Sequence, residues 1–206
     1  MHYENGKIWL TRGNRHKNYL KIDGYDRELV YLENGPPGGG GGNSSVFRVV
    51  TDDGYTPDYA IKICNYPEDS RDGRDLRRVR RFEHEIEANI RAVKASLESK
   101  VIQLITDGRL QISKRTFRYF LMPKADGNLG QHLDREELGV PAKLLLCRNI
   151  FETVNQLHKI DIYHRDIKPG NFMMFGNTVK VGDLGLCAFR DEESDLDRGD
   201  WHIGPF

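Results

Sequence analysis

The sequence has little cysteine and no long apolar run. Its 206 residues include only three cysteines, Cys64, Cys147 and Cys187, which are too few and too scattered for a disulfide framework or a zinc site. An odd count without a Cys-x-x-Cys pair is typical of reduced thiols in a cytosolic protein. No stretch approaches the roughly 20 apolar residues of a membrane-spanning helix, and the first residues lack the apolar core of a secretory signal. We therefore expect a soluble, cytoplasmic chain.

The sequence also lacks an excess of charge of either sign, because Lys plus Arg and Asp plus Glu each number 31. No net field therefore attracts the chain to nucleic acid or to an anionic membrane. Basic and aromatic residues do mix near the N-terminus, at Trp9, Arg12, Arg15, Lys17 and Tyr19, where a nucleic-acid surface is one interpretation. Acidic residues share that stretch, so a solvated hairpin is favoured, and we expect neither a nucleic acid nor a membrane as partner.

Two short stretches contain the residue types that phosphoryl transfer needs. Residues 163–171 read Tyr-His-Arg-Asp-Ile-Lys-Pro-Gly-Asn, and residues 183–185 read Asp-Leu-Gly. They supply a base-like aspartate, a lysine, an amide and a second aspartate, namely Asp166, Lys168, Asn171 and Asp183. Such a set can place the metal ions of a nucleotide beside a hydroxyl group. A polar turn between two strands is the alternative, which the agreement of the joined motif disfavours.

These stretches resemble the catalytic loop, H-R-D-x-x-x-x-N, and the D-F-G motif of eukaryotic-type serine/threonine protein kinases. The resemblance implies an α+β, bilobal protein-kinase-like fold, with a small β-rich N-lobe carrying one long helix and an incomplete helical C-lobe. It also implies ATP and Mg²⁺ as cofactors and a protein substrate with a serine or threonine acceptor. Asp166 would orient the acceptor hydroxyl and accept its proton, while Lys168 would offset negative charge on the transferred group. Asn171 and Asp183 would be the ligands of Mg²⁺, which prefers oxygen.

A glycine run is similar to the phosphate-binding loop of that family, G-x-G-x-x-G-x-V. The pattern fits Gly39, Gly41, Ser44 and Val46, with a serine in place of the third glycine. Glycine allows backbone N–H groups to approach phosphate oxygens because it has no Cβ. Five consecutive glycines are more often a flexible linker, so this stretch alone is weak evidence.

The sequence Tyr-Ala-Ile-Lys that ends at Lys62 resembles the V-A-I-K strand of the family. Strand alternation puts Ala60 and Lys62 on one face, where alanine admits adenine and lysine reaches the phosphates. A helix expected over Leu76–Ala95 would supply a glutamate to pair with this lysine. The helical wheel does not choose between Glu83 and Glu85, but the F-x-x-E-I pattern of the family favours Glu85, with Glu83 as the fallback.

The segment after the expected strand 116–122 resembles the hinge between the two lobes. Met122 takes the gatekeeper position, and Pro123 stands where the family usually has glutamate. Proline has no N–H but keeps its carbonyl, which would accept from the amino group of adenine. Ala125 would provide the remaining N–H and C=O groups.

The motifs divide the chain into four parts. An N-terminal extension, expected to form a β-ribbon, covers residues 1–28, and an N-lobe covers 29–122. A hinge at 123–128 then leads to a partial C-lobe at 129–206. We expect strands over 29–32 and 101–112 and a helix from Pro141 to about residue 160. The apolar stripes of the two helices are predicted at Phe82, Ile86, Ile90 and Val93, and at Cys147, Ile150, Val154 and Leu157.

The resemblance stops early, because no A-P-E motif or later helices of the family follow residue 185. A longer chain would supply those C-lobe helices, and without them we expect exposed apolar surface on the second helix. Ser194 is the one hydroxyl-bearing residue after Leu184, and Pro205 stands where the family usually has threonine.

The leading interpretation is a C-terminally truncated serine/threonine protein kinase, and the truncation is compatible with an inactive fragment. A pseudokinase or binding module is one alternative, and it would be marked by loss of Lys62, Asp166, Asn171 or Asp183. A small-molecule kinase of related fold is the other alternative. It would share the two aspartates but not the His-Arg-Asp-Ile-Lys-Pro string.

Overall fold

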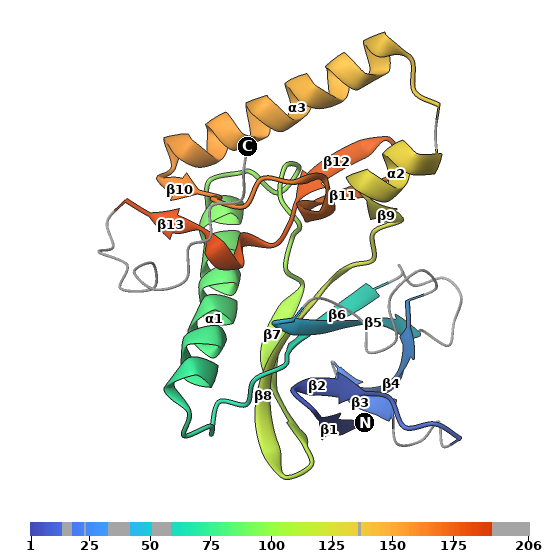
Figure 1. Ribbon diagram of the computed structural model, residues 1–206, viewed down its shortest axis with the longest axis vertical. Helices are drawn as coiled ribbons and strands as arrows, with labels where there is room; N and C mark the ends of the chain where they lie inside the picture. Colours follow the sequence, from blue (N-terminus) through green and yellow to red (C-terminus); the bar gives the residue numbers. More distant parts are fainter. Residues whose placement is uncertain (14–17, 23, 33–41, 51–58, 136, 191–206) are drawn as a thin grey trace.

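The computed structural model describes residues 1–13, 18–22, 24–32, 42–50, 59–135 and 137–190. A six-stranded antiparallel sheet in the order β3-β4-β5-β6-β8-β7 forms most of its first half (Figure 1). Its strands are β3 (Tyr19–Ile22), β4 (Tyr25–Tyr31), β5 (Ser44–Val50), β6 (Tyr59–Cys64), β7 (Thr106–Ile112) and β8 (Arg115–Pro123). Strand β7 is shorter than the strand predicted over 101–112, because residues 102–105 belong to no strand and Val101 makes only an isolated bridge to Val181.

The N-terminal residues complete the core of this sheet. Strands β1 (His2–Glu4) and β2 (Lys7–Trp9) form a hairpin whose turn, Asn5–Gly6, has the positive φ angles of 51° and 72° that this residue pair favours. Fully buried Ile8 packs in one cluster with Phe47, Phe117 and other sheet residues. The N–H of Leu10 donates to the Tyr31 hydroxyl at 3.0 Å.

The boundary predicted after residue 28 falls inside β4. Strand β3, which precedes it, is the edge strand of the six-stranded sheet rather than part of a separate ribbon. The pairing of Tyr19 with Glu28 and Ile22 with Tyr25 joins the two strands into one hairpin. The first residues therefore fold with the sheet that follows them.

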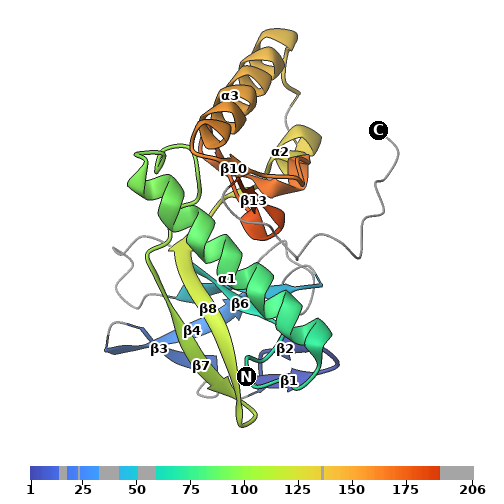
Figure 2. The ribbon, with the colours of Figure 1, turned by 90° about the vertical axis from the view of Figure 1, so that its left-hand side faces the viewer.

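Helix α1 (Gly73–Lys94) lies across one face of the sheet (Figure 2). The side chain of Asp72 caps it by accepting from the Arg74 N–H at 2.8 Å. Early in the helix Phe82 packs on Phe120 of the sheet, with ring centroids 5.3 Å apart. Later turns bury Ala88, Asn89 and Ala92 instead, so the prediction of a single straight stripe was wrong: Ile90 is 41% exposed. The buried face turns around the helix because its C-terminal half packs against residues 184–189 and not against the sheet.

The rest of the chain combines two helices with short strands. Strands β9, β11 and β12 form a three-stranded sheet, and β10 pairs with β13. The elements are β9 (Gly127–Asn128), α2 (Leu129–Arg135), α3 (Val140–Lys159), β10 (Ile162–Tyr163), β11 (Phe172–Phe175), β12 (Thr178–Val181) and β13 (Ala188–Phe189), with 3₁₀ turns at Pro169–Asn171 and Leu184–Leu186. None of the helices in the described ranges has the length and apolar character needed to cross a membrane.

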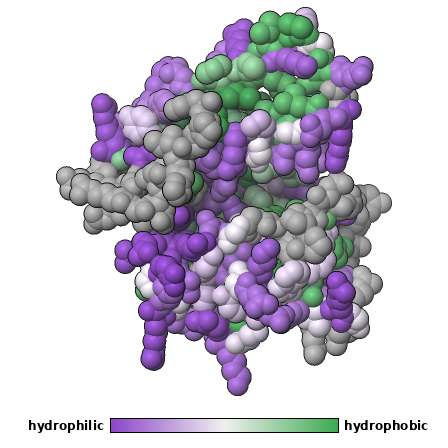
Figure 3. Space-filling view, viewed as in Figure 1, coloured by the Kyte–Doolittle hydropathy of each residue, from purple (hydrophilic) through white to green (hydrophobic). Residues whose placement is uncertain are grey.

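Helix α3 buries one side and exposes apolar residues on the other. Thr153 and Leu157 are buried, with Ile150 packed partly against the same cluster. Cys147 is exposed, so its predicted place in the buried stripe was wrong. Four large apolar residues of the helix are exposed: Val140, Leu144, Leu145 and Phe151. Figure 3 shows hydrophobic surface at the top of the molecule, where α3 lies. Phe151 is 75% exposed, and Leu144 lies seven residues before it on the same side of the helix, so the exposed apolar residues are not isolated.

We predict that Ile8→Ala lowers the free energy of unfolding by about 2 to 4 kcal/mol, since it leaves a cavity in a filled core. Tyr25→Ala, at a site 66% exposed in the same N-terminal region, is the control and costs less than about 1 kcal/mol. Urea denaturation followed by circular dichroism measures both. If both variants lose less than about 1 kcal/mol of unfolding free energy, the hairpin does not contribute to the hydrophobic core.

Candidate active site

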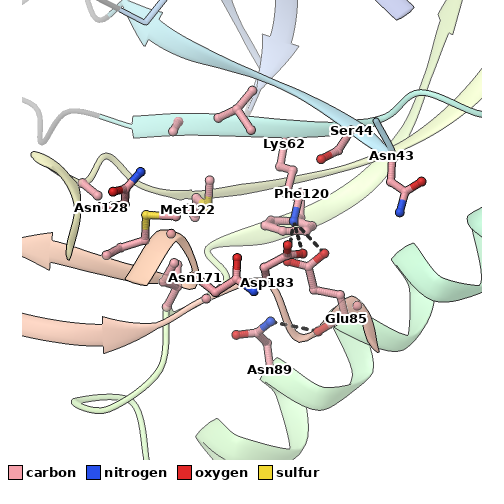
Figure 4. A pocket seen from close by; sticks show the side chains of 18 of the residues that line it. Asn43, Ser44, Lys62, Glu85, Asn89, Phe120, Met122, Asn128, Asn171 and Asp183 are labelled. Carbon is pink, nitrogen blue, oxygen red and sulfur yellow. Dashed lines mark hydrogen bonds and ion pairs between the residues drawn. The ribbon is translucent and has the colours of Figure 1, made fainter. Parts of the chain in front are cut away.

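A cleft of about 710 Å³ separates the six-stranded sheet from the C-terminal elements. Both parts of the chain line it (Figure 4). Every predicted site residue that the structure describes lies on this cleft: Ser44, Val46, Ala60, Lys62, Glu85, Met122, Pro123, Ala125, Asp166, Lys168, Asn171 and Asp183. Gly39 and Gly41, like Ser194 and Pro205, lie outside the described residues. The structure thus gathers side chains that are up to 139 positions apart in the sequence (Ser44 to Asp183).

A buried ion pair joins the sheet to α1. Strand β6 points Lys62 at Glu85, whose two carboxylate oxygens lie 2.7 and 2.8 Å from Nζ. Asp183 Oδ1 is 3.1 Å from the same Nζ, so one ammonium group connects three segments of the chain (Figure 4). The fallback residue, Glu83, instead lies 3.8 Å from Arg118 of β8, with its side chain 43% exposed.

The electrostatics of this cluster keep Lys62 charged. Burial acts to lower the pKa of Lys62, but the facing carboxylates of Glu85 and Asp183 outweigh it and raise the pKa above its usual value. Burial raises the pKa of Glu85, and the ion pair with Lys62 opposes that effect. The pair therefore depends on each partner: removal of either charge leaves the other buried with reduced compensation.

Asp183 adopts a backbone conformation that is uncommon for residues other than glycine. Its φ and ψ angles are 52° and 58°, in the left-handed region, where aspartate is one of the tolerated residues. The turn follows Gly182 and directs the carboxylate into the cleft beside Lys62. Its side chain remains 48% exposed, so its second oxygen is accessible from the cleft.

Asp166 is held by two neighbours in the same loop. Lys168 Nζ donates to Asp166 Oδ2 at 2.7 Å, and Asn171 Nδ2 donates to that oxygen at 2.9 Å and to the Asp166 carbonyl at 2.8 Å. Partial burial acts to raise the pKa of Asp166, but these hydrogen bonds prevail and lower it. The carboxylate is therefore ionised at neutral pH and can accept a hydrogen bond from a hydroxyl group.

His164 holds this loop in place through hydrogen bonds of its ring. Its ring is buried, and its Nδ1 accepts from the Asp166 N–H at 3.3 Å, which assigns the proton to Nε2 opposite the Gly182 carbonyl at 3.1 Å. Burial lowers the pKa of His164, so the ring is neutral at pH 7. These contacts make this histidine a scaffold group that positions the loop. The ring joins the catalytic-loop candidate to the turn that carries Asp183.

The opposite end of the cleft is apolar and suits a flat ring. Val46 and Ala60 come from the sheet, and Met173 comes from β11 on the other side. Met122 and Ala125 lie at the edge where β8 leaves the sheet, with Pro123 as the last residue of that strand. Backbone groups of this segment can exchange hydrogen bonds with a heterocycle bound between the apolar side chains.

The cleft also contains residues that were not predicted from the sequence, among them Met173, Asn89 and Arg81. In β11, Phe172 is buried and Met173 points to the opposite face of the strand. Had this strand been predicted from the sequence, its alternation would have indicated that Met173 faces the cleft. Asn89 lies one helical turn after Glu85, and its Nδ2 donates to the Glu85 carbonyl at 2.8 Å. Its Oδ1 has no hydrogen-bond partner among the described residues. Arg81 lies one turn before Glu85 and also lines the cleft. The i,i+4 spacing from Glu85 could have indicated both.

The segment after Asp183 is fixed against α1 by aromatic contacts. The rings of His84 and Phe189 meet edge to face at 4.3 Å, and the Arg91 guanidinium lies 3.8 Å over Phe189. Cys187 Sγ is 3.8 Å from His84 Nδ1. Because Phe189 also pairs with Ile162 of β10, α1 is connected to the strand that leads into the Asp166 loop.

Comparison with known proteins agrees with this geometry. The family model described as the protein kinase domain matches residues 34–200. A probable serine/threonine-protein kinase of Encephalitozoon cuniculi is 33% identical over 87 residues, which are 42% of this chain and 16% of that protein. Calcium-dependent protein kinase 27 of Arabidopsis thaliana is 37% identical over 67 residues, 29% of this chain and 14% of the relative.

Mitogen-activated protein kinase 12 of Homo sapiens is 32% identical over 76 residues, 36% of this chain and 21% of the relative. The matched regions therefore span less than a quarter of each of these three proteins.

We predict that Glu85→Ala lowers the free energy of unfolding by about 3 to 5 kcal/mol, because it leaves the Lys62 ammonium buried without its main partner. Glu83→Ala, two residues earlier on the same helix, removes a partly exposed charge. Arg118 keeps Glu68 and Asp107 within 3.9 Å, so this variant costs about 1 kcal/mol or less. Chemical denaturation of the two variants at pH 7 compares them. A similar loss in both would show that the buried ion pair does not stabilise the fold.

Proposed function

Because the chain belongs to the protein kinase family, we propose that it is a serine/threonine protein kinase that transfers the γ-phosphoryl group of ATP to a protein hydroxyl group. The observation that carries the proposal is the convergence of Lys62, Glu85, Asp166, Asn171 and Asp183 on one cleft. Two curated relatives whose names include serine/threonine-protein kinase support the acceptor type. The cytoplasmic location and the absence of nucleic-acid and membrane partners stay predictions.

The residues of the cleft suit a magnesium nucleotide. Asn171 uses its Nδ2 to hold Asp166, so its Oδ1 is the atom left for a cation, and Asp183 offers an accessible carboxylate oxygen. Magnesium sites at nucleotides typically use only one or two oxygen ligands from the protein, and phosphates and water complete the coordination. When bound, Mg·ATP would supply the phosphoryl group and neutralise its charge. Lys62 would bind phosphate oxygens, while Ala60, Met122, Pro123 and Ala125 would position adenine.

The acceptor end of the cleft has the groups that the reaction requires. Asp166 would orient the substrate hydroxyl and accept its proton, since its carboxylate is already ionised and fixed by Asn171. Lys168 lies beside it and holds a positive charge where negative charge develops. The pseudokinase alternative predicts loss of one of these groups, and none is lost.

The exposed apolar side of α3 supports the proposal that this part belongs to a larger C-lobe. Leu144 and Phe151 are 64% and 75% exposed, and the named relatives are several times longer than the regions that match. We propose that further helices of the whole protein cover this side of α3. On this proposal, the two parts flanking the cleft are the N-lobe and the first portion of the C-lobe.

Asp166→Asn is expected to lower phosphoryl transfer by about a hundredfold to ten-thousandfold, the usual contribution of a general base. Nucleotide affinity should stay nearly unchanged, because Asp166 faces the acceptor. Asp134→Asn on α2, which is exposed, removes the same charge and is the control. Product formation measured with labelled ATP, together with titration calorimetry, tests both expectations. Wild-type turnover in Asp166→Asn would refute the assignment of the base.

Nucleotide binding should depend on the metal. We expect ATP affinity to be at least about tenfold higher with Mg²⁺ than with a chelator, because Asp183 and the phosphates need a cation between them. Asp183→Asn should remove most of that difference. Calorimetric titrations under the two conditions measure it. Equal affinity with and without the metal would indicate a metal-independent binding module instead.

A further inference from the structure

The N-terminal half of α1 concentrates positive charge in a chain that has no net charge. Residues 71–81 contain six arginines, no lysine and two aspartates, Asp72 and Asp75. The two aspartates have local partners: Asp72 caps the helix, and Asp75 accepts from the Ser70 hydroxyl at 2.7 Å. The surface formed by Arg71, Arg74, Arg77, Arg80 and Arg81 is called the arginine surface below.

This placement opposes the stability of the helix. The first turns of a helix carry the positive end of its dipole, where acidic residues are favourable and arginines are not. Arginines three and four positions apart also repel one another, as at Arg74 and Arg77 and at Arg77 and Arg81. The arrangement therefore costs folding free energy within the chain.

The described residues neutralise only a small part of this charge. Arg78 points away to Asn43 and Tyr66, at 2.8 and 2.6 Å, and Arg74 has an exposed contact with Asp72 at 3.3 Å. No carboxylate among the described residues forms an ion pair with Arg77, Arg80 or Arg81. Arg77 and Arg80 are exposed, and Figure 3 shows the hydrophilic surface on this side of the molecule.

The arginine surface leads to the cleft. Arg81 is both part of this surface and a lining residue of the cleft, one helical turn before Glu85. A peptide whose acceptor hydroxyl lies near Asp166 could therefore extend acidic side chains toward α1. Guanidinium groups bind carboxylates through two parallel hydrogen bonds, which gives orientation as well as attraction.

We infer that the arginine surface is a docking site for an acidic segment of the protein substrate. The inference rests on the proposed kinase function and adds a substrate class to it: proteins with a run of aspartate or glutamate near the acceptor residue. The attraction acts between charges at the surface, so added salt weakens it. At an ionic strength of about 0.1 M the Debye length is about 10 Å, and above this concentration most of the attraction should be screened.

The direct test is binding of a fluorescent twelve-residue peptide of glutamate and alanine, which has no hydroxyl acceptor, to the whole protein. Fluorescence anisotropy should show salt-dependent binding, and Arg77→Gln/Arg80→Gln should weaken it about fivefold. The control, Lys94→Gln/Lys143→Gln, loses the same charge at exposed sites, with Lys94 about 25 Å along the helix from Arg77, and should change binding less than about twofold. The arginine variant should also keep or raise the thermal midpoint, which a structural role would lower.

Binding does not require catalysis, so it separates this inference from the proposed function. Acceptor peptides with glutamate or glutamine beside the same serine then test specificity: the ratio of their kcat/KM values should fall about fivefold in the arginine variant and stay constant in the control. Undetectable peptide binding, or equal loss in both double variants, would overturn the inference.

Discussion

The ion pair between Lys62 and Glu85 is the contact on which the geometry of the cleft depends. It is the point where β6, α1 and the turn at Asp183 meet, and it is almost completely removed from water. Because a buried charge is costly without its partner, a shift of any one of these segments away from the others would carry a penalty of several kcal/mol. The ion pair therefore fixes the relative position of these three segments at the cleft itself.

Helix α1 transmits this constraint across the cleft. Its first half packs on the sheet through Phe82, and its second half packs on residues 184–189 through His84. Phe189 then connects it to β10, and His164 connects the Asp166 loop to Gly182. The apolar end of the cleft and the end that carries Asp166 are thus parts of one packed arrangement, and the orientation of α1 influences both.

The sequence predicted which side chains gather at the cleft better than it predicted how the helices pack. Lys62, Glu85, Asp166 and Asn171 could be assigned to one site because their motifs combine fixed residue types with fixed spacing. Cys147 and Ile90 were misplaced, because a helical wheel assumes that one face is buried along the whole helix. In α1 the packing partner changes midway, and in α3 the apolar character continues onto the exposed side. The short strands β9 to β13 were not anticipated, since two to four residues are too few for a periodic signal.

The N-terminal hairpin shows that the start of the family match and the start of the folded unit differ in this chain. The match to the kinase family model begins at residue 34, whereas Ile8, Leu10, Ile22 and Leu29 before that point belong to the same hydrophobic cluster as Phe47 and Phe117. The matched region is therefore shorter than the unit of folding. The core residues outside it are constrained by volume and not by chemistry, so exchanges among apolar types that conserve the total volume should leave the cleft in place.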